Sequence, residues 1–250
     1  MRSFRIIPRL DIKQGHLIKG VQMEGWRKVG NPADFAKTYY EAGADELLLM
    51  DVVASLYGRN SLHELIKTVC SDIFVPVTVG GGIRTIADAY SVFEVGADKI
   101  SINTAATADP DFISELAKTF GNQAVVISLE VGIIDGQYQV LTDNGRNLTG
   151  LDPVTWVKRA EDLGAGEVLL SNIGADGTGK GFDLELINRI CDAVSLPIVT
   201  GGGFGSNDHL NDLITQTDVS GMTVAQALHW EKTTIKDIKQ SVINDSIFIR

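Results

Sequence analysis

The chain has 250 residues, of which 44% are hydrophobic, and it carries a net charge of −10 with two cysteines. Its length suits one large core, its acidity disfavours non-specific binding to nucleic acid, and no apolar run approaches the roughly 18 residues of a membrane helix. Because an apolar strand begins near the N-terminus, we expect no signal peptide, and few cysteines then indicate a reducing cytoplasm.

Apolar runs of strand length alternate with helical stretches along the whole chain. Near-continuous apolar character is typical of parallel strands that are buried on both faces. The expected strands are residues 5–10, 47–51, 75–79, 99–102, 124–129, 168–172, 197–200 and, with fewer apolar residues, 219–224. The expected helices are residues 31–42, 61–73, 85–95, 110–120, 153–163 and 184–194. Two of them begin at Asn31-Pro32 and Asp152-Pro153, an N-cap followed by proline at the first helical position.

This alternation and a long internal repeat predict the fold. Residues 75–83 return as residues 196–204, an offset of 121 residues, and Cys70 and Cys191 share that offset. Strand and helix repeated about eight times over 250 residues predict a (β/α)₈ TIM barrel, an α/β fold, as a single domain over residues 1–250. The half-barrels are expected at about 1–121 and 122–250. An open doubly wound sheet is the alternative, but it gives no reason for a twofold repeat.

Carboxylates follow the expected strands, where barrel enzymes carry their chemistry. Asp11 ends the first strand and Glu130 the fifth, so twofold symmetry places them across the barrel mouth. One acid and one base on two sides of a substrate would suit that arrangement. Asp51 has a weaker claim, because its symmetry mate is Asn172. Each strand-end aspartate could instead only cap the loop that follows it.

Two further loops offer side chains to a ligand. The glycine-rich loop that begins with Asp176, Gly177 and Thr178 follows the sixth expected strand and can carry a carboxylate into the site. A flexible connection is its other interpretation, since such loops are common on this face. Lys19, after the first strand, could reach a phosphate or be an ordinary surface lysine.

The two triple-glycine runs predict two phosphate sites. Glycine lets the backbone approach a ligand closely, and free N–H groups at a helix start attract phosphate. A tight turn is the alternative for one such run, but two runs at symmetric barrel positions disfavour it. The first site is expected to include Gly81, Gly82, Asn103 and Thr104, and the second Gly202 and Gly203.

These residues together resemble the cyclase subunit of imidazole glycerol phosphate synthase, the HisF family, over nearly the whole chain. The segments that carry the resemblance are residues 5–11, 45–47, 79–83, 96–105, 120–121, 164–167 and 176–178. The resemblance implies a cytoplasmic, ammonia-dependent lyase of histidine biosynthesis, with no cofactor and no metal. Its substrate would carry a phosphate at each end, and its products would be imidazole glycerol phosphate and aminoimidazole carboxamide ribotide. Asp11 and Glu130 would be its catalytic acid and base.

The resemblance also implies a partner. A HisH-like glutaminase would form a heterodimer at the bottom of the barrel, and its ammonia would pass through the core. Asp98 matches a position that contacts the glutaminase. Four charged residues would ring the entrance as a gate, and the same four could equally be a stabilising ring of ion pairs. They are Arg5, Glu46, Lys99 and Glu167.

Three positions depart from the family pattern. Glu130 stands where the family usually has Asp, Arg9 where it often has a small thiol, and Ala225-Gln226 where it has Ala-Ser. The changes touch the reacting centre and one phosphate site, so two alternatives stay open. One is a HisF-like paralogue that delivers ammonia for amidine formation on a sugar in surface-polysaccharide biosynthesis. The other is a non-catalytic docking subunit that activates a glutaminase. The sister isomerase of histidine synthesis is disfavoured, because it needs no ammonia gate.

Overall fold

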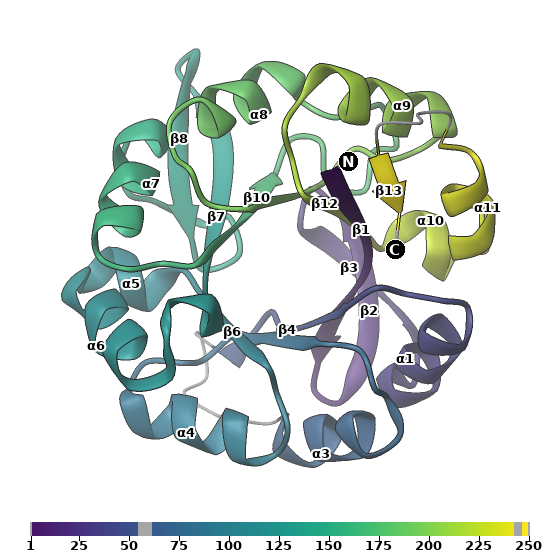
Figure 1. Ribbon diagram of the computed structural model, residues 1–250, viewed down its shortest axis with the longest axis horizontal. Coiled ribbons are helices and arrows are strands. Elements are labelled where there is room, and N and C mark those ends of the chain that lie inside the picture. The colour runs from purple at the N-terminus through teal and green to yellow at the C-terminus, as the bar shows by residue number, and fades with distance from the viewer. Residues whose placement is uncertain (1, 55–61, 243–246, 250) are drawn as a thin grey trace.

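The computed structural model describes residues 2–54, 62–242 and 247–249 of the chain. Parallel strands close into a barrel with helices around it (Figure 1). The barrel strands are β1 (Arg2–Lys13), β4 (Leu47–Asp51), β5 (Val77–Gly80), β6 (Lys99–Ile102), β7 (Val125–Ile134), β10 (Glu167–Asn172), β11 (Ile198–Gly201) and β12 (Gly221–Val224). Since β1 pairs in parallel with both β4 and β12, the ring has no open edge. The predicted barrel is confirmed, and the doubly wound alternative is wrong.

Helices cover the outside of this ring. They are α1 (Pro32–Glu41), α3 (His63–Asp72), α4 (Ile86–Glu94), α5 (Thr104–Ala108), α6 (Asp111–Phe120), α7 (Pro153–Asp162), α8 (Leu184–Cys191), α9 (Asn207–Gln216), α10 (Gln226–His229) and α11 (Ile235–Gln240). Both predicted N-caps are confirmed: Asn31 Oδ1 accepts from the Ala33 N–H at 2.9 Å, and Asp152 Oδ1 from the Thr155 N–H at 2.8 Å. Residue 61, the expected start of the second helix, lies outside the described residues.

The first strand is longer at both ends than its apolar run of residues 5–10. Residues 2–4 pair with β13 (Ile247–Ile249), so the two ends of the chain lie side by side (Figure 1). Residues 11–13 pair antiparallel with β2 (His16–Val21). The hydrophobic pattern does not reveal these extra strand residues. Residues 2–4 depend on a partner strand that is remote in the sequence, and residues 11–13 extend the strand through a hairpin with polar positions.

Two hairpins grow from opposite sides of the barrel and were not predicted. One is β2 with β3 (Glu24–Gly30), which continues β1. The other is β8 (Gln137–Thr142) with β9 (Asn147–Leu148), which continues β7. Their tips meet, since Asn144 Nδ2 donates to the Met23 carbonyl at 3.4 Å. The hairpins therefore cover the end of the barrel that is formed by the C-terminal ends of the parallel strands.

Apolar side chains fill two separate layers. The larger core lies between the strands and the helices. A smaller cluster lies inside the barrel and includes Ile7, Leu48, Val126, Leu169 and Val199. Both cysteines are free, Cys70 on α3 and Cys191 on α8. In the part of the chain that the structure describes, no helix is both long and apolar enough to cross a membrane.

Candidate functional site

Asp11 lies at the barrel mouth between two cations. Its Oδ1 accepts a 2.8 Å hydrogen bond from Arg9 Nε, and its Oδ2 is 3.7 Å from Lys19 Nζ. All three side chains are buried. Burial raises the pKa of Asp11, but the positive charges of Arg9 and Lys19 outweigh burial and hold it below its ordinary value. Asp11 is therefore an ionised, firmly held carboxylate.

Glu130, the other predicted catalytic carboxylate, has different surroundings. It is 5% exposed, and its Oε2 accepts a 2.9 Å hydrogen bond from the Gly145 N–H in the β8–β9 turn. Burial raises the pKa of Glu130 from 4.5 to about 7, although Arg9 and the Gly145 N–H act in the other direction. A carboxyl group with this pKa can give or take a proton near neutral pH.

Lys19 and Asp176 meet above Asp11. Lys19 Nζ contacts both carboxylate oxygens of Asp176, at 2.9 and 3.0 Å, and its side chain is 4% exposed. It is therefore not a surface lysine. Asp176 also holds the β2–β3 tip, because its carbonyl accepts from the Gln22 N–H at 2.8 Å. The structure thus brings together three of the predicted residues, Asp11, Lys19 and Asp176.

The first predicted phosphate site coincides with a cavity of about 100 Å³ at the mouth. Gly81 has φ +96°, and a Cβ there would lie 2.2 Å from the Asp51 carbonyl oxygen, so only glycine fits. Ser101 Oγ and Asn103 Oδ1 are buried and have no hydrogen-bond partner among the described residues. Such orphaned acceptors and donors suit a bound polar ligand. The cavity is lined by Asp51, Gly81, Gly82, Asn103, Thr104 and Glu130, among others.

The second predicted site is a smaller cavity, of about 30 Å³. Gly203 has φ +115°, and a Cβ there would lie 2.0 Å from the Gly181 carbonyl oxygen. The lining includes Arg9, Lys19, Gly177, Gly202, Gly203 and Gln226. Thr178 does not line it: its hydroxyl donates to the Ala175 carbonyl at 2.8 Å and closes its own loop. Arg9, Lys19 and Gln226 therefore also line this site, for which the sequence predicted only Gly202 and Gly203.

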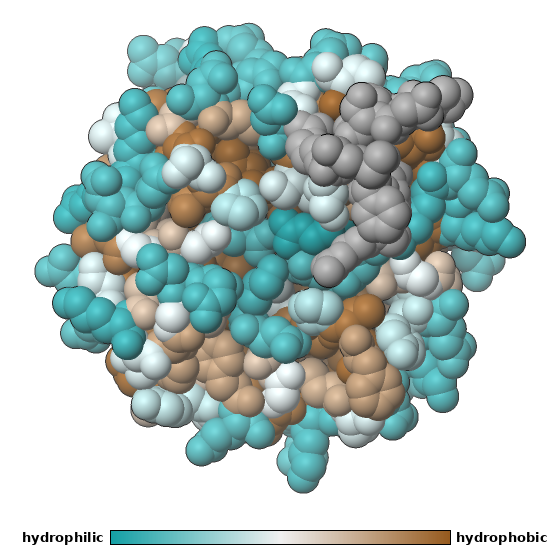
Figure 2. Space-filling view, in the orientation of Figure 1, coloured by the Kyte–Doolittle hydropathy of each residue, from teal (hydrophilic) through white to brown (hydrophobic). Residues whose placement is uncertain are grey.

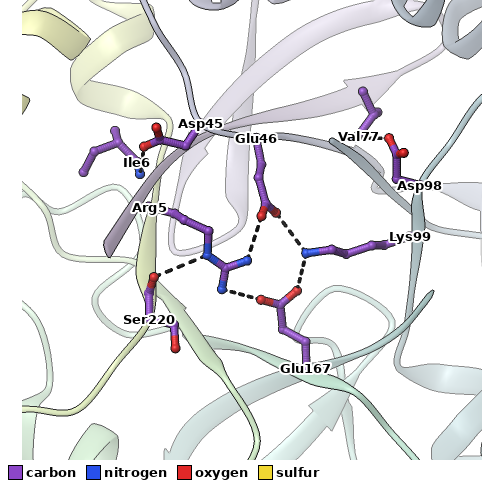
Figure 3. Close-up of polar contacts among 9 residues, drawn as sticks. All are labelled: Arg5, Ile6, Asp45, Glu46, Val77, Asp98, Lys99, Glu167 and Ser220. Carbon is purple, nitrogen blue, oxygen red and sulfur yellow. Dashed lines mark hydrogen bonds and ion pairs between the residues drawn. The ribbon is translucent and has the colours of Figure 1, made fainter. Parts of the chain in front are cut away.

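A closed ring of ion pairs crosses the other end of the barrel (Figure 3). Arg5 bonds to Glu46 at 2.8 Å and to Glu167 at 2.5 Å, while Lys99 bonds to the same two carboxylates at 3.1 and 2.8 Å. This end faces the viewer in Figure 2, where hydrophilic residues gather at the centre of the face. The four residues predicted as a gate are thus linked into one closed network at this end of the barrel.

A cavity of about 20 Å³ lies directly inside the ring. That is room for one molecule of the size of water or ammonia. Its walls combine the apolar interior layer with the hydroxyls of Thr78 and Thr223. Thr223 also lines the second mouth cavity, so the interior space and the mouth share a wall.

Asp98 is exposed beside this ring, and its carboxylate accepts a 2.8 Å hydrogen bond from the Val77 N–H (Figure 3). Phe74 is 82% exposed and packs edge-on against Tyr40.

Sequence reasoning also missed Ser171, Gly145 and His229 around the carboxylates. Arg9 Nη1 donates to Ser171 Oγ at 3.2 Å, and His229 Nδ1 lies 2.6 Å from the Tyr39 hydroxyl. Within the described ranges, no cluster of three or more His, Cys, Asp or Glu side chains could hold a metal ion.

Comparison with known proteins agrees with this geometry. Residues 5–234 match the family model of the histidine biosynthesis proteins. The chain is 52% identical over 212 residues to the imidazole glycerol phosphate synthase subunit HisF of Legionella pneumophila, covering 84% of this chain and all of that protein. It is 39% identical to HisF of Bacillus cereus strain Q1, with both chains covered completely. HisF of Methanopyrus kandleri is 38% identical, with 98% of this chain and 97% of that protein covered.

Proposed function

The chain belongs to the histidine biosynthesis protein family as a subunit of the HisF type, and from that premise we propose how its barrel works. It is the cyclase subunit of an imidazole glycerol phosphate synthase, a lyase of histidine biosynthesis. We propose that it uses ammonia to close the imidazole ring of a substrate with a phosphate at each end. Its products are then imidazole glycerol phosphate and aminoimidazole carboxamide ribotide.

One observation carries this proposal: two glycine-walled cavities flank a pair of carboxylates at one barrel mouth. Gly81 and Gly82 line one cavity, and Gly202 and Gly203 line the other. If a molecule placed one phosphate in each cavity, its central part would lie over the mouth, beside the two carboxylates. A bisphosphate therefore fits the arrangement better than a substrate with one anionic end.

The carboxylates supply the proton chemistry of the reaction. Addition of ammonia to a carbonyl group makes the oxygen negative and the nitrogen positive. Glu130 can exchange protons with both atoms near neutral pH, because its pKa is raised to about 7 by burial. Asp11, held ionised by Arg9 and Lys19, stabilises positive charge on the nitrogen.

Ammonia would reach the mouth through the barrel. A HisH-like glutaminase that docks over the ring of Arg5, Glu46, Lys99 and Glu167, and contacts Asp98, would release ammonia at the ring. The cavity inside the ring has room for one ammonia molecule, and Thr78 offers it a hydrogen bond. The ring also acts as a stabilising network, since each carboxylate has two cationic partners. The complex would work in the cytoplasm.

The direct test supplies ammonium salt and the histidine-pathway substrate to the purified chain. Ammonia-dependent formation of imidazole glycerol phosphate is the expected result, and its loss in Asp11→Asn would tie turnover to the mouth. A folded, pure wild-type chain that gives no product at any ammonium concentration would contradict the proposal.

Arg9 and Gln226 favour a second candidate, a paralogue with the same ammonia supply and a different acceptor. Arg9 places a buried cation against Asp11, and Gln226 puts an amide into the second cavity. A sugar acylamino group that becomes an amidine would need ammonia but no second phosphate. Ammonia-dependent turnover of such a sugar, with none of the histidine-pathway substrate, would select this candidate.

A further inference from the structure

Arg9 is a cation inside the barrel. Strand residues alternate between the two faces, so Ile7, Arg9 and Asp11 of β1 share the inward face. Ile7 belongs to the apolar interior layer, and Arg9 lies one layer nearer the mouth with 6% of its surface exposed. A buried charge is stable only when it is paired and hydrogen-bonded. The partners of this guanidinium therefore indicate what it does.

Those partners fix one carboxylate from two sides. Arg9 Nε donates to Asp11 Oδ1 at 2.8 Å, and Arg9 Nη1 is anchored to Ser171 Oγ at 3.2 Å. The other oxygen of Asp11 faces Lys19 Nζ at 3.7 Å. Each oxygen of Asp11 thus has its own cation, and a turn of the carboxylate would lose one of them.

Glu130 lies across the mouth without any such partner. Among the described residues, no Lys, Arg or His nitrogen lies within ion-pair distance of its carboxylate, which accepts a 2.9 Å hydrogen bond from the Gly145 N–H and interacts with the neutral side chain of Asn103. It lines the larger mouth cavity, where a ligand can reach it. The two carboxylates at the mouth therefore differ in their charge partners and in their access to the larger cavity.

The other charged groups near Asp11 do not change this contrast. Lys19 on β2 is shared between Asp11 and Asp176, and Glu130 on β7 contributes a weaker field at Arg9. His229 on α10 also faces Asp11, but burial lowers the pKa of His229 to about 4, so it is uncharged near neutral pH. Arg9 is the cation in hydrogen-bond contact with Asp11.

We propose that Arg9 is a positioning residue that keeps Asp11 as a fixed carboxylate and so leaves Glu130 as the group that exchanges protons with the substrate. The inference deepens the proposed function, on which it rests for the identity of the reacting group. The division of roles itself belongs to the free protein and does not require any substrate.

The proton balance of ammonia addition follows from this division. The nitrogen lone pair forms the C–N bond while the carbonyl electron pair moves to oxygen. Protonated Glu130 gives its proton to that oxygen and becomes a carboxylate. It then takes one proton from the positively charged nitrogen, which restores its acid form. Asp11 stays ionised throughout and stabilises the positive nitrogen.

The test is a carboxyl titration of the substrate-free chain by NMR, with ¹³C in the side-chain carboxyls of Asp and Glu. Asp11→Asn and Glu130→Gln assign the two signals by their disappearance. In Arg9→Met we expect the Asp11 midpoint to rise by about 1–3 pH units, the usual effect of losing an adjacent cation. The Glu130 midpoint should rise as well, because Arg9 lowers it in the wild type. Arg9→Lys should restore part of the Asp11 midpoint.

Two further variants make the test decisive. Arg189→Met removes the same charge from the exposed surface of α8 and should leave both midpoints unchanged. Ser171→Ala frees one end of the guanidinium and should raise the Asp11 midpoint by less than Arg9→Met does, which keeps the test available if Arg9→Met does not fold. Unchanged midpoints in folded Arg9→Met, or in Ser171→Ala where Arg9→Met does not fold, would overturn the inference. An inactive chain with shifted midpoints would instead count against the proposed function alone.

Discussion

Replacing Glu130 by Gln should stabilise the protein, and the gain should grow with pH. Burial raises the pKa of Glu130 in the folded protein to about 7, from an ordinary value of 4.5. Below about pH 4.5 the group is protonated in both the folded and the unfolded chain, so it carries no penalty. Between these values the unfolded chain has lost a proton that the folded chain keeps, and stability falls as the pH rises. Above about pH 7 the folded chain bears the full cost of a buried charge.

The size of that cost follows from the pKa difference of about 2.5. At about 1.4 kcal/mol for each pH unit, it amounts to about 3 kcal/mol above pH 8. Gln has nearly the same volume, stays neutral at every pH, and offers an oxygen to the Gly145 N–H. A gain of this size corresponds to about 6–12 °C in the thermal midpoint of a chain this long.

Thermal and urea unfolding of both proteins between pH 4 and pH 9 would measure the difference. We expect it to be close to zero near pH 4 and to reach its full value above pH 8. Glu115→Gln, an exposed glutamate on α6, is the matched control and should give a small difference at every pH. Two results would refute the reasoning. One is a stability gain from Glu130→Gln that is the same at pH 4 and pH 9. The other is a wild-type protein that is more stable than Glu130→Gln at pH 9.

Asp11→Asn should abolish ammonia-dependent turnover with an unchanged circular dichroism spectrum; retained turnover would remove Asp11 from the chemistry. Lys99→Met should lower the unfolding free energy by about 3 kcal/mol, because the buried carboxylates of Glu46 and Glu167 lose one of their two cationic partners; denaturant titration showing no loss would mean that the ring is not stabilising. Crystals soaked in phosphate should show an anion beside Gly81 in the first mouth cavity, and an empty cavity would count against a phosphate site there.

The barrel could be predicted because its signals are local and repeated. Triple glycines recur at an offset of 121 residues, and the proline after Asn31 marks a helix start that the structure confirms. The hairpins could not be predicted in the same way. Their strands are largely polar, and the β2–β3 turn is made by Gln22 and Met23 at φ +52° and +59°, where a turn signal would be Asn-Gly.

The sequence could predict which residues belong to the site, but it could not predict which of them contact one another. The i, i+2 spacing on one strand does place Arg9 on the same face as Asp11. Which carboxylate Arg9 binds depends on packing, since Glu130 and Asp176 are also near enough to act on it. From the sequence alone, Lys19 could be a surface residue. In the structure the β2–β3 hairpin covers the mouth and buries Lys19 against Asp176.

The two mouth cavities hold charge in different ways, which bears on how an acidic protein binds an anion. Arg9 and Lys19 line the second cavity, but each already faces a carboxylate, Asp11 or Asp176. An anion there would share those two cations with the carboxylates, while the 2.8 Å hydrogen bond from Arg9 Nε keeps Asp11 in place. The first cavity instead contains Glu130, which is neutral while it keeps its proton. An anion in that cavity would disfavour ionisation of Glu130, so in the proposed mechanism anion binding at the first cavity and retention of the Glu130 proton would reinforce each other.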